Sequence, residues 1–153
     1  MNKIQFTVYG EAKPAGSKRA LVITPKGGGK PRAIVTDANK NSQSWKQEVS
    51  AAASMAYSGK LLEGPLFVTF SFYRVRPKGH LKKDGNLTSS APLYPTTRPD
   101  LLKVARGIED SLTGVIYKDD SQIVNEVLEK LYGDKAYVVV TILHDELTVT
   151  KGK

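Results

Sequence analysis

Runs of β-branched and aromatic residues, some alternating with polar ones, predict long strands at residues 3–9, 66–75 and 136–143. The segment QIVNEVLEKLY, residues 122–132, fits a strand or a helix by its pattern alone. We expect a strand there, because the Gly-Asp turn that follows would fold it back on residues 136–143 as a terminal hairpin.

Two shorter β-branched runs, residues 21–24 and 33–36, predict a second hairpin. Its tip, PKGGGKPR, lacks the Gly-Lys-Ser/Thr ending of a Walker phosphate-binding loop. The tip either contacts a phosphate backbone or is a solvated turn, and the sequence favours neither. The cations of this region are the first candidate DNA-binding residues: Lys18, Arg19, Lys26, Lys30 and Arg32.

Residues 42–58 have the 3.6-residue period of an amphipathic helix. Ser44 and Gln47 resemble a capping box at its start, and Gly59 fits its end. Trp45 fits a core anchor better than a base-stacking platform. The apolar stripe consists of Trp45, Val49, Ala52, Ala53 and Ala56.

Residues 100–112 predict a second helix, because Pro99 is typical of a helix start and Gly114 of a helix end. On a helical wheel one face is apolar and is expected to be buried: Leu101, Val104, Ala105, Ile108 and Leu112. The opposite face is polar and pairs two aspartates with two cations: Asp100, Lys103, Arg106, Gly107 and Asp110.

Composition adds an expectation about the partner. The net charge of +8 favours a polyanion, with nucleic acid first, over a basic surface that only aids solubility. Residues 1–60 and 74–103 are basic, whereas residues 104–153 hold nine acidic residues against six basic ones. The basic segments therefore flank an acidic region, which suits a metal site inside a phosphate-attracting surface.

Several classes of protein are excluded or disfavoured. The chain has no cysteine, which rules out disulfides, thiol nucleophiles and cysteine-ligated metals. It has no apolar run of transmembrane length, and its N-terminus has the pattern of a strand rather than a signal peptide. We expect a cytoplasmic protein that does not enter a membrane.

The connection at residues 76–97 is long, basic and rich in Pro, Gly and Ser. Such connections are usually functional or disordered, and we expect function because this one leads to Asp100. Its region supplies further candidate DNA contacts, Lys82, Lys83 and Arg98. His80 is a weak catalytic candidate.

Residues 98–122 gather five acidic side chains, four of them aspartates. Asp119 and Asp120 follow a short apolar run that we expect to be extended, so only one of them would meet the helix face that carries Asp100. Carboxylates from separate elements suit Mg²⁺, which prefers oxygen ligands and can activate a water for phosphodiester hydrolysis. The alternative is that Asp100 is a helix cap and DDS a turn.

The pieces RPDLLKVAR, DSLTG and DDSQ, with KPAGSKR and SAPLYPTTRPD upstream, resemble the RusA-type Holliday junction resolvases, a family common in phages and prophages. The resemblance covers most of the chain. It implies one small α/β (α+β) domain over residues 1–153, with a mixed sheet, two main helices and a basic loop at 76–97.

The resemblance also implies a homodimer that uses Mg²⁺, for which Mn²⁺ substitutes, to resolve four-way DNA junctions by paired nicks. Asp100 and Asp120 match the family's metal-binding aspartates, and Arg106 stands where the family has a functional lysine. Asp110 and Asp119 are candidate helpers at the metal, and Lys103 joins Arg106 as a candidate phosphate contact.

One position departs from the family. Its second aspartate is Leu102 here, and its usual asparagine is Lys103. The wheel places Leu102 beyond the apolar face, so burial in the core does not explain it. Either Asp110 or Asp119 substitutes for the missing carboxylate, or the metal is held more weakly, or the protein has lost strong activity. We favour Asp110, because it shares a helix face with Asp100.

Other functions remain as alternatives. A degenerate member of the family would bind junctions without cutting them. A PD-(D/E)xK nuclease is disfavoured, because no acidic residue downstream of Asp100 is followed two residues later by Lys. A Ser-His-Asp hydrolase is disfavoured because His80 and His144 are the only histidines and no nucleophile elbow is present.

Overall fold

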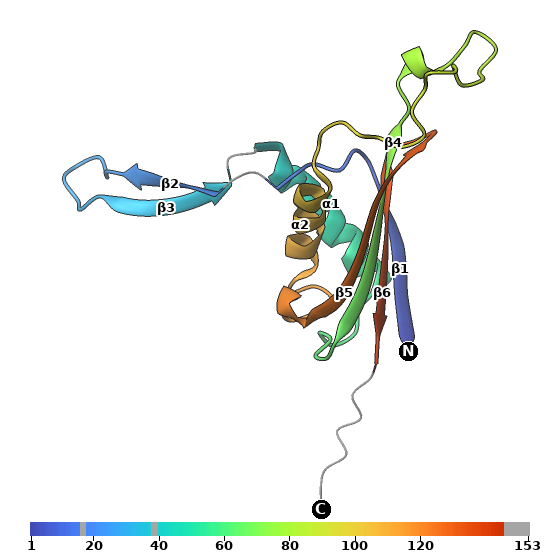
Figure 1. The fold of residues 1–153 in the computed structure, drawn as a ribbon. Helices are drawn as coiled ribbons and strands as arrows, with labels where there is room; N and C mark the ends of the chain where they lie inside the picture. The colour runs from blue at the N-terminus through green and yellow to red at the C-terminus, as the bar shows by residue number, and fades with distance from the viewer. Residues whose placement is uncertain (16–17, 38–39, 146–153) are drawn as a thin grey trace, which may run out of the picture.

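The computed structural model describes residues 1–15, 18–37 and 40–145, which form a single small α+β domain. Four strands make a mixed sheet in the order β1-β6-β4-β5, and two helices cover one of its faces (Figure 1). The strands of this sheet are β1 Asn2–Tyr9, β4 Leu66–Val75, β5 Ile123–Gly133 and β6 Tyr137–His144.

The helices are α1 Lys40–Ala56 and α2 Leu101–Leu112, and the core lies between them and the sheet. Trp45 is buried in this core, as predicted. Helix α1 begins at Lys40, so Ser44 lies inside it and the predicted capping box is wrong. Ala56 is exposed and is not part of the buried stripe. Side chains that are almost completely buried include Val49, Phe70, Val104, Ile108, Leu112 and Val140.

The C-terminal strands do not pair with each other, so the predicted terminal hairpin is wrong. β6 runs antiparallel to both β1 and β4, whereas β5 runs parallel to β4 on its other side. The apolar strand β4 therefore lies between β5 and β6. Parallel neighbours cannot be joined by a tight turn, and α2 lies in the long connection from β4 to β5.

The predicted hairpin at 21–36 is confirmed as a separate two-stranded sheet of β2 Lys18–Ile23 and β3 Arg32–Asp37. It extends away from the body of the molecule (Figure 1). We call residues 18–37 the arm.

The connection after β4 is ordered rather than structureless. It contains a 3₁₀ helix, η1 Lys78–His80, and then a small loop closed by backbone hydrogen bonds between Lys82 and Asn86 and between Thr88 and His80. The Arg76 guanidinium donates to the Pro92 carbonyl at 2.6 Å and lies 4.2 Å from the centre of the Tyr132 ring. Among the described residues, no helix is long and apolar enough to cross a membrane.

Candidate active site

Helix α2 carries the first candidate residue at its N-terminal end. Asp100 is the N-cap residue, but its side chain makes no capping hydrogen bond. The carboxylate instead lies 3.5 Å from the Lys103 Nζ, and more than half of each side chain is exposed. Asp100 and Lys103, which were predicted to share one face of the helix, therefore lie side by side, and the Asp100 carboxylate oxygens face solvent, where a cation can reach them.

Two cations that the sequence did not single out hold the backbone just before Asp100. The Arg74 guanidinium donates to the Arg98 carbonyl at 2.7 Å, and Lys130 Nζ donates to the carbonyls of Thr97 at 3.0 Å and Pro99 at 3.2 Å. These side chains come from the neighbouring parallel strands β4 and β5. Their signal in the sequence is a cation near the end of a predicted strand, which is too common to be diagnostic.

The predicted apolar face of α2 is confirmed, with Val104, Ala105, Ile108 and Leu112 buried and Leu101 packed against the core. Gly107, predicted on the polar face, is buried instead. The segment that leads into the arm crosses the helix there: a Cβ at Gly107 would lie 3.4 Å from the Lys13 carbonyl oxygen. This backbone covers Gly107 and accounts for its burial.

The C-terminal end of α2 leads into the DDSQ motif, residues 119–122. The residues before this motif were predicted to be extended, but they form turns and no strand. Asp119 caps a short 3₁₀ helix, η2 Asp120–Gln122. The Asp119 carboxylate accepts from the Ser121 amide at 2.8 Å, which lowers the pKa of Asp119, and the Gln122 side chain accepts from the Asp119 amide. Gln122 also donates to the carbonyls of Leu62 and Gly64, which anchors η2 to a distant loop.

This capping box separates the roles of the paired aspartates. Asp119 is engaged in the local fold, whereas the exposed carboxylate of Asp120 forms no ion pair within the described part of the chain. Asp120 is thus the member of the pair whose carboxylate is available to a ligand.

Further carboxylates gather near Asp120. Burial, and after it the nearby carboxylates of Glu126, Asp120 and Asp110, raise the pKa of Glu109 to about 8. Neither Glu109 nor Glu126 was predicted as a site residue. The sequence did carry a signal for Glu126: the alternation along β5 places this acidic residue on the same face as the partly buried Leu128.

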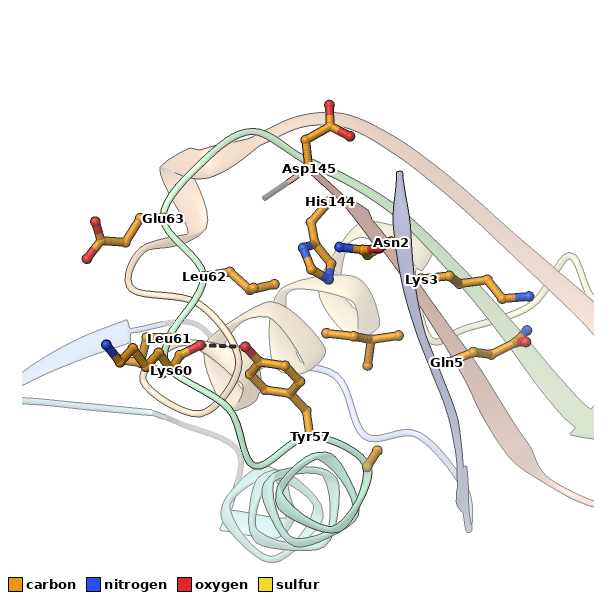
Figure 2. Close-up of a pocket in the computed structure, with 12 residues that line it drawn as sticks. Asn2, Lys3, Gln5, Tyr57, Lys60, Leu61, Leu62, Glu63, His144 and Asp145 are labelled. Carbon is orange, nitrogen blue, oxygen red and sulfur yellow. Dashed lines mark hydrogen bonds between the residues drawn. The ribbon is translucent and has the colours of Figure 1, made fainter. Parts of the chain in front are cut away.

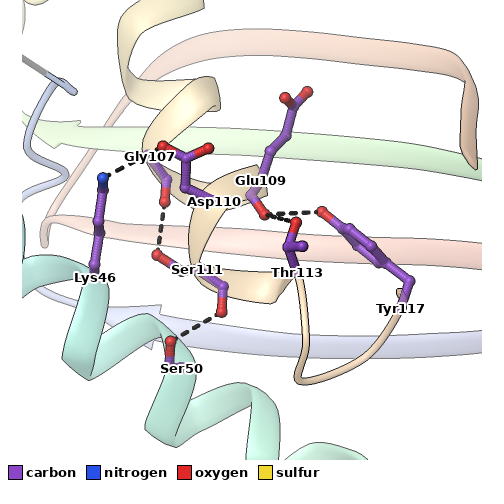
Figure 3. A network of polar contacts seen from close by, with 8 residues as sticks. All are labelled: Lys46, Ser50, Gly107, Glu109, Asp110, Ser111, Thr113 and Tyr117. Atoms are coloured by element: carbon purple, nitrogen blue, oxygen red, sulfur yellow. Dashed lines mark hydrogen bonds and ion pairs between the residues drawn. The ribbon is translucent and has the colours of Figure 1, made fainter. Parts of the chain in front are cut away.

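Asp110 was predicted to share the polar face of α2 with Lys103 and Arg106, but its ion-pair partner comes from the other helix. It forms an ion pair with Lys46 of α1, at 3.3 Å (Figure 3). Beside this pair, Ser50 of α1 donates to the Ser111 carbonyl, which joins the two helices, and the Ser111 hydroxyl donates to the Gly107 carbonyl within α2. Arg106 is exposed and forms no ion pair with any described residue.

Within one chain the structure does not bring Asp100 and Asp120 together. Asp100 caps the start of α2, a helix of 12 residues that is about 18 Å long, and Asp120 lies in η2, which follows the other end of this helix. Within the described ranges, no three acidic or histidine side chains are close enough to hold a metal. Leu102 is 70% exposed, which confirms that it is not a core residue.

The candidate DNA-binding residues occupy three places. Lys26, Lys30 and Arg32 are exposed at and beside the tip of the arm, and the backbone of Lys18 and Arg19 forms its first strand. Lys82 and Lys83 are exposed in the loop at 76–97, and Arg98 is exposed just before Asp100. His80 packs edge-on against Tyr132 instead of facing any candidate site residue.

A separate cavity of about 950 Å³ contains none of the predicted site residues. It lies between the C-terminal end of α1, the loop at residues 60–63, the start of β1 and the end of β6 (Figure 2). Tyr57 and the buried His144 contribute to its wall, and Asn2 and Asp145 line it as well. The candidate active site is thus a surface feature of α2 and not this cavity.

Comparison with known proteins agrees with the motifs on α2 and η2. The family model described as "Endodeoxyribonuclease RusA" matches residues 11–143. The chain is also 34% identical over 144 residues to a protein of Bacillus subtilis (strain 168) described as "Uncharacterized protein YqaN", covering 93% of this chain and 96% of that protein. The chain therefore belongs to the RusA endodeoxyribonuclease family.

Proposed function

We propose that this protein is a Mg²⁺-dependent endonuclease that resolves four-way DNA junctions in the cytoplasm by paired nicks during recombination and repair. The observation that carries the proposal is a pair of exposed aspartates, Asp100 at the start of α2 and Asp120 in η2 beyond its other end, in a RusA-family chain of net charge +8. The charge supports binding to a polyanion, and the carboxylates support metal-assisted phosphodiester hydrolysis.

The separation of these two aspartates supports a site shared between two copies of the chain. A two-fold axis that crosses the middle of α2 would place the N-terminal end of one helix beside the C-terminal end of the other. Asp100 of one protomer would then face Asp120 of the partner subunit. In this arrangement the homodimer is needed to assemble each metal site, and two sites form per dimer, as paired nicks require.

Surface chemistry along α2 and β5 supports such a dimer. β5 is an edge strand of 11 residues. Long exposed edges are normally paired or covered. Leu102 is 70% exposed near the start of α2, and Val124 is 61% exposed just after η2, near the other end. The same two-fold axis would cover the edge of β5 together with Val124 and remove them from water, and it would leave Leu102 beside the shared metal site.

The residues fit a hard divalent cation, because Asp100 and Asp120 offer exposed carboxylate oxygens. Bound Mg²⁺ supplies a water of lowered pKa and polarises the scissile phosphodiester. Lys103 and Arg106 are exposed on the same helix and would hold the phosphate and offset its growing negative charge. Asp110 and Asp119 remain the candidates for the carboxylate lost at Leu102; Asp110 is the better one, because Asp119 is engaged in its cap.

One observation favours a second function, junction binding without cleavage. Leu102 stands where the family has an aspartate, which removes a negative charge and one possible ligand from the site. The basic surfaces would still hold DNA in such a protein.

Incubation of an end-labelled synthetic four-way junction with the purified protein distinguishes these functions. Symmetric nicks with Mg²⁺ and none with EDTA are expected for the resolvase. Binding without nicks in Mg²⁺ and in Mn²⁺ would establish the binding protein instead. A linear duplex of the same sequence serves as the substrate control and should be bound more weakly and left uncut.

A further inference from the structure

The arm has few contacts with the rest of the domain that could stabilise it. β2 and β3 pair with each other over six residue pairs, and neither packs extensively on another described element. An isolated two-stranded hairpin is only marginally stable in water. A hairpin held out in solvent therefore gains much of its order from whatever it contacts.

The root of the arm rests on the helix that carries Asp100. Ala15 is buried, and its amide donates to the Lys103 carbonyl at 3.0 Å. One turn further along α2, Gly107 lets the Lys13 carbonyl come close. The chain thus enters the arm from a point fixed against the first turns of α2, within a few residues of the candidate metal ligand.

The arm has the charge and shape of a DNA-binding ribbon. Residues 18–37 contain five Lys or Arg and one acidic residue. Each strand has six residues, so the ribbon is roughly 20 Å long. Gly27 and Gly28, at its tip, have φ of 110° and 92°, a backbone region that glycine adopts without strain. A tip without bulky side chains can approach a nucleic-acid backbone closely.

We propose that the arm is a DNA grip, in which the two-stranded ribbon lies in a groove of the duplex next to the scissile phosphate and binds its backbone through the cations at and beside the tip. This inference rests on the proposed function, since it assigns the DNA contacts of the same nuclease. The major groove admits a two-stranded ribbon. Contacts to phosphates fix position without reading sequence, which suits an enzyme that recognises branch structure.

A second copy of this chain is the less favoured occupant. The arm of one copy would have to meet an acidic surface on the other, whereas the arm's own cations would repel each other across a two-fold axis. DNA offers a regular array of negative charge at every orientation of the arm.

Salt dependence tests the grip directly. The triple variant Lys26→Gln, Lys30→Gln, Arg32→Gln is compared with a control, Lys3→Gln, Lys60→Gln, Lys135→Gln, which loses the same charge from exposed positions outside the arm. Junction affinity is measured in EDTA across a salt series. The arm variant should lose about 2 to 3 from the slope of log affinity against log salt, at about 0.9 per phosphate contact, and the control much less.

Equal slopes for the arm variant and the wild type would overturn the grip. So would a change of the arm variant from dimer to monomer by sedimentation with an unchanged salt slope, because the arm would then bind a second copy. These readouts do not need cleavage. If the arm variant loses salt slope as expected but the wild-type protein never nicks junctions, the proposed nuclease is refuted and the DNA grip is not.

The absence of cysteine allows the tip to be located on the DNA. A Lys30→Cys variant carrying a tethered iron–EDTA reagent should cut both strands of one duplex arm within about one helical turn of the branch point. Diffuse cutting along all four arms would contradict a fixed position of the ribbon.

Discussion

The two ends of α2 carry the same chemical group in different surroundings. At the N-terminal end, Asp100 stands in solvent beside one lysine, on a backbone that Arg74 and Lys130 hold in place. At the C-terminal end, Asp120 shares its neighbourhood with Asp110, Glu109 and Glu126, and the pKa of Glu109 rises to about 8. One end presents a single positioned carboxylate, whereas the other has an excess of negative charge that protonation of Glu109 relieves.

This contrast indicates a division of labour. In the proposed shared site, the crowded end would attract a divalent cation, and Asp100 of the other protomer would complete its coordination. If the two ends belong to one site, changes at either end should abolish cleavage, while changes around them should have smaller effects.

The largest expected effect comes from Asp120→Asn. Because Asp120 is a proposed metal ligand, the cleavage rate should fall by more than about 100-fold, given that even residues behind metal ligands typically contribute 10- to 100-fold. Asp119→Asn is the matched control, because asparagine caps as well as aspartate and the cap should persist. Rates come from single-turnover cleavage of a labelled junction. Equal losses in the two variants would contradict the separate roles of this pair.

Leu102→Asp would add a second carboxylate near Asp100, at the N-terminal end of α2. Leu102 is exposed, so the change has little cost in folding. The added ligand oxygens should lower the Mg²⁺ concentration for half-maximal cleavage by about tenfold, an interaction free energy of about 1.4 kcal/mol. A Mg²⁺ titration of the variant and the wild type measures it. A higher Mg²⁺ requirement would show that position 102 does not face the metal.

Lys130→Met should loosen the backbone that holds Asp100 without removing a proposed metal ligand. The ammonium donates to two carbonyls before Asp100, and leaving them unpaired should cost about 1 to 3 kcal/mol of unfolding free energy. We also expect a smaller cleavage rate at saturating Mg²⁺ with little change in junction affinity. Lys135→Met, at an exposed position of the turn after β5, controls for the lost charge. A stability loss with normal cleavage would remove the positioning role.

The smallest effect is a pH dependence at the crowded end. The pKa of Glu109 lies near 8 in the folded protein, above its ordinary value of 4.5, so folding favours the protonated form. The contribution of Glu109 to the free energy of unfolding is therefore fully present below about pH 4.5 and declines as the pH rises toward 8. Melting temperatures in EDTA should fall between pH 5 and 8 by more for the wild type than for Glu109→Gln. Parallel melting curves for the two proteins would contradict the raised pKa.

The sequence predicted the local structure of the site better than its assembly. The period of α2 correctly placed Val104 and Ile108 in the core and Leu102 outside it, because side-chain burial on a helix follows its repeat. The pairing of β5 with β4 was not predictable from the same pattern. Strand order depends on contacts between distant residues, and a Gly-Asp turn by itself fits a hairpin equally well.

The roles of individual carboxylates also depended on tertiary contacts. The DDSQ spacing does not reveal that Asp119 caps η2, because this requires the turn to fold and Gln122 to reach Leu62. Asp110 was expected to share a helix face with Arg106, but its ion-pair partner is Lys46 from α1. Such pairings between helices leave no periodic signal along the chain.

The most direct test of the shared site mixes two inactive variants. Asp100→Asn and Asp120→Asn proteins are combined, unfolded and refolded together so that subunits exchange, and then incubated with a labelled junction and Mg²⁺. A site built from Asp100 of one protomer and Asp120 of the partner subunit is intact once in each mixed dimer, so the mixture should regain single nicks but not paired ones. A mixture as inactive as either variant alone would contradict the shared site.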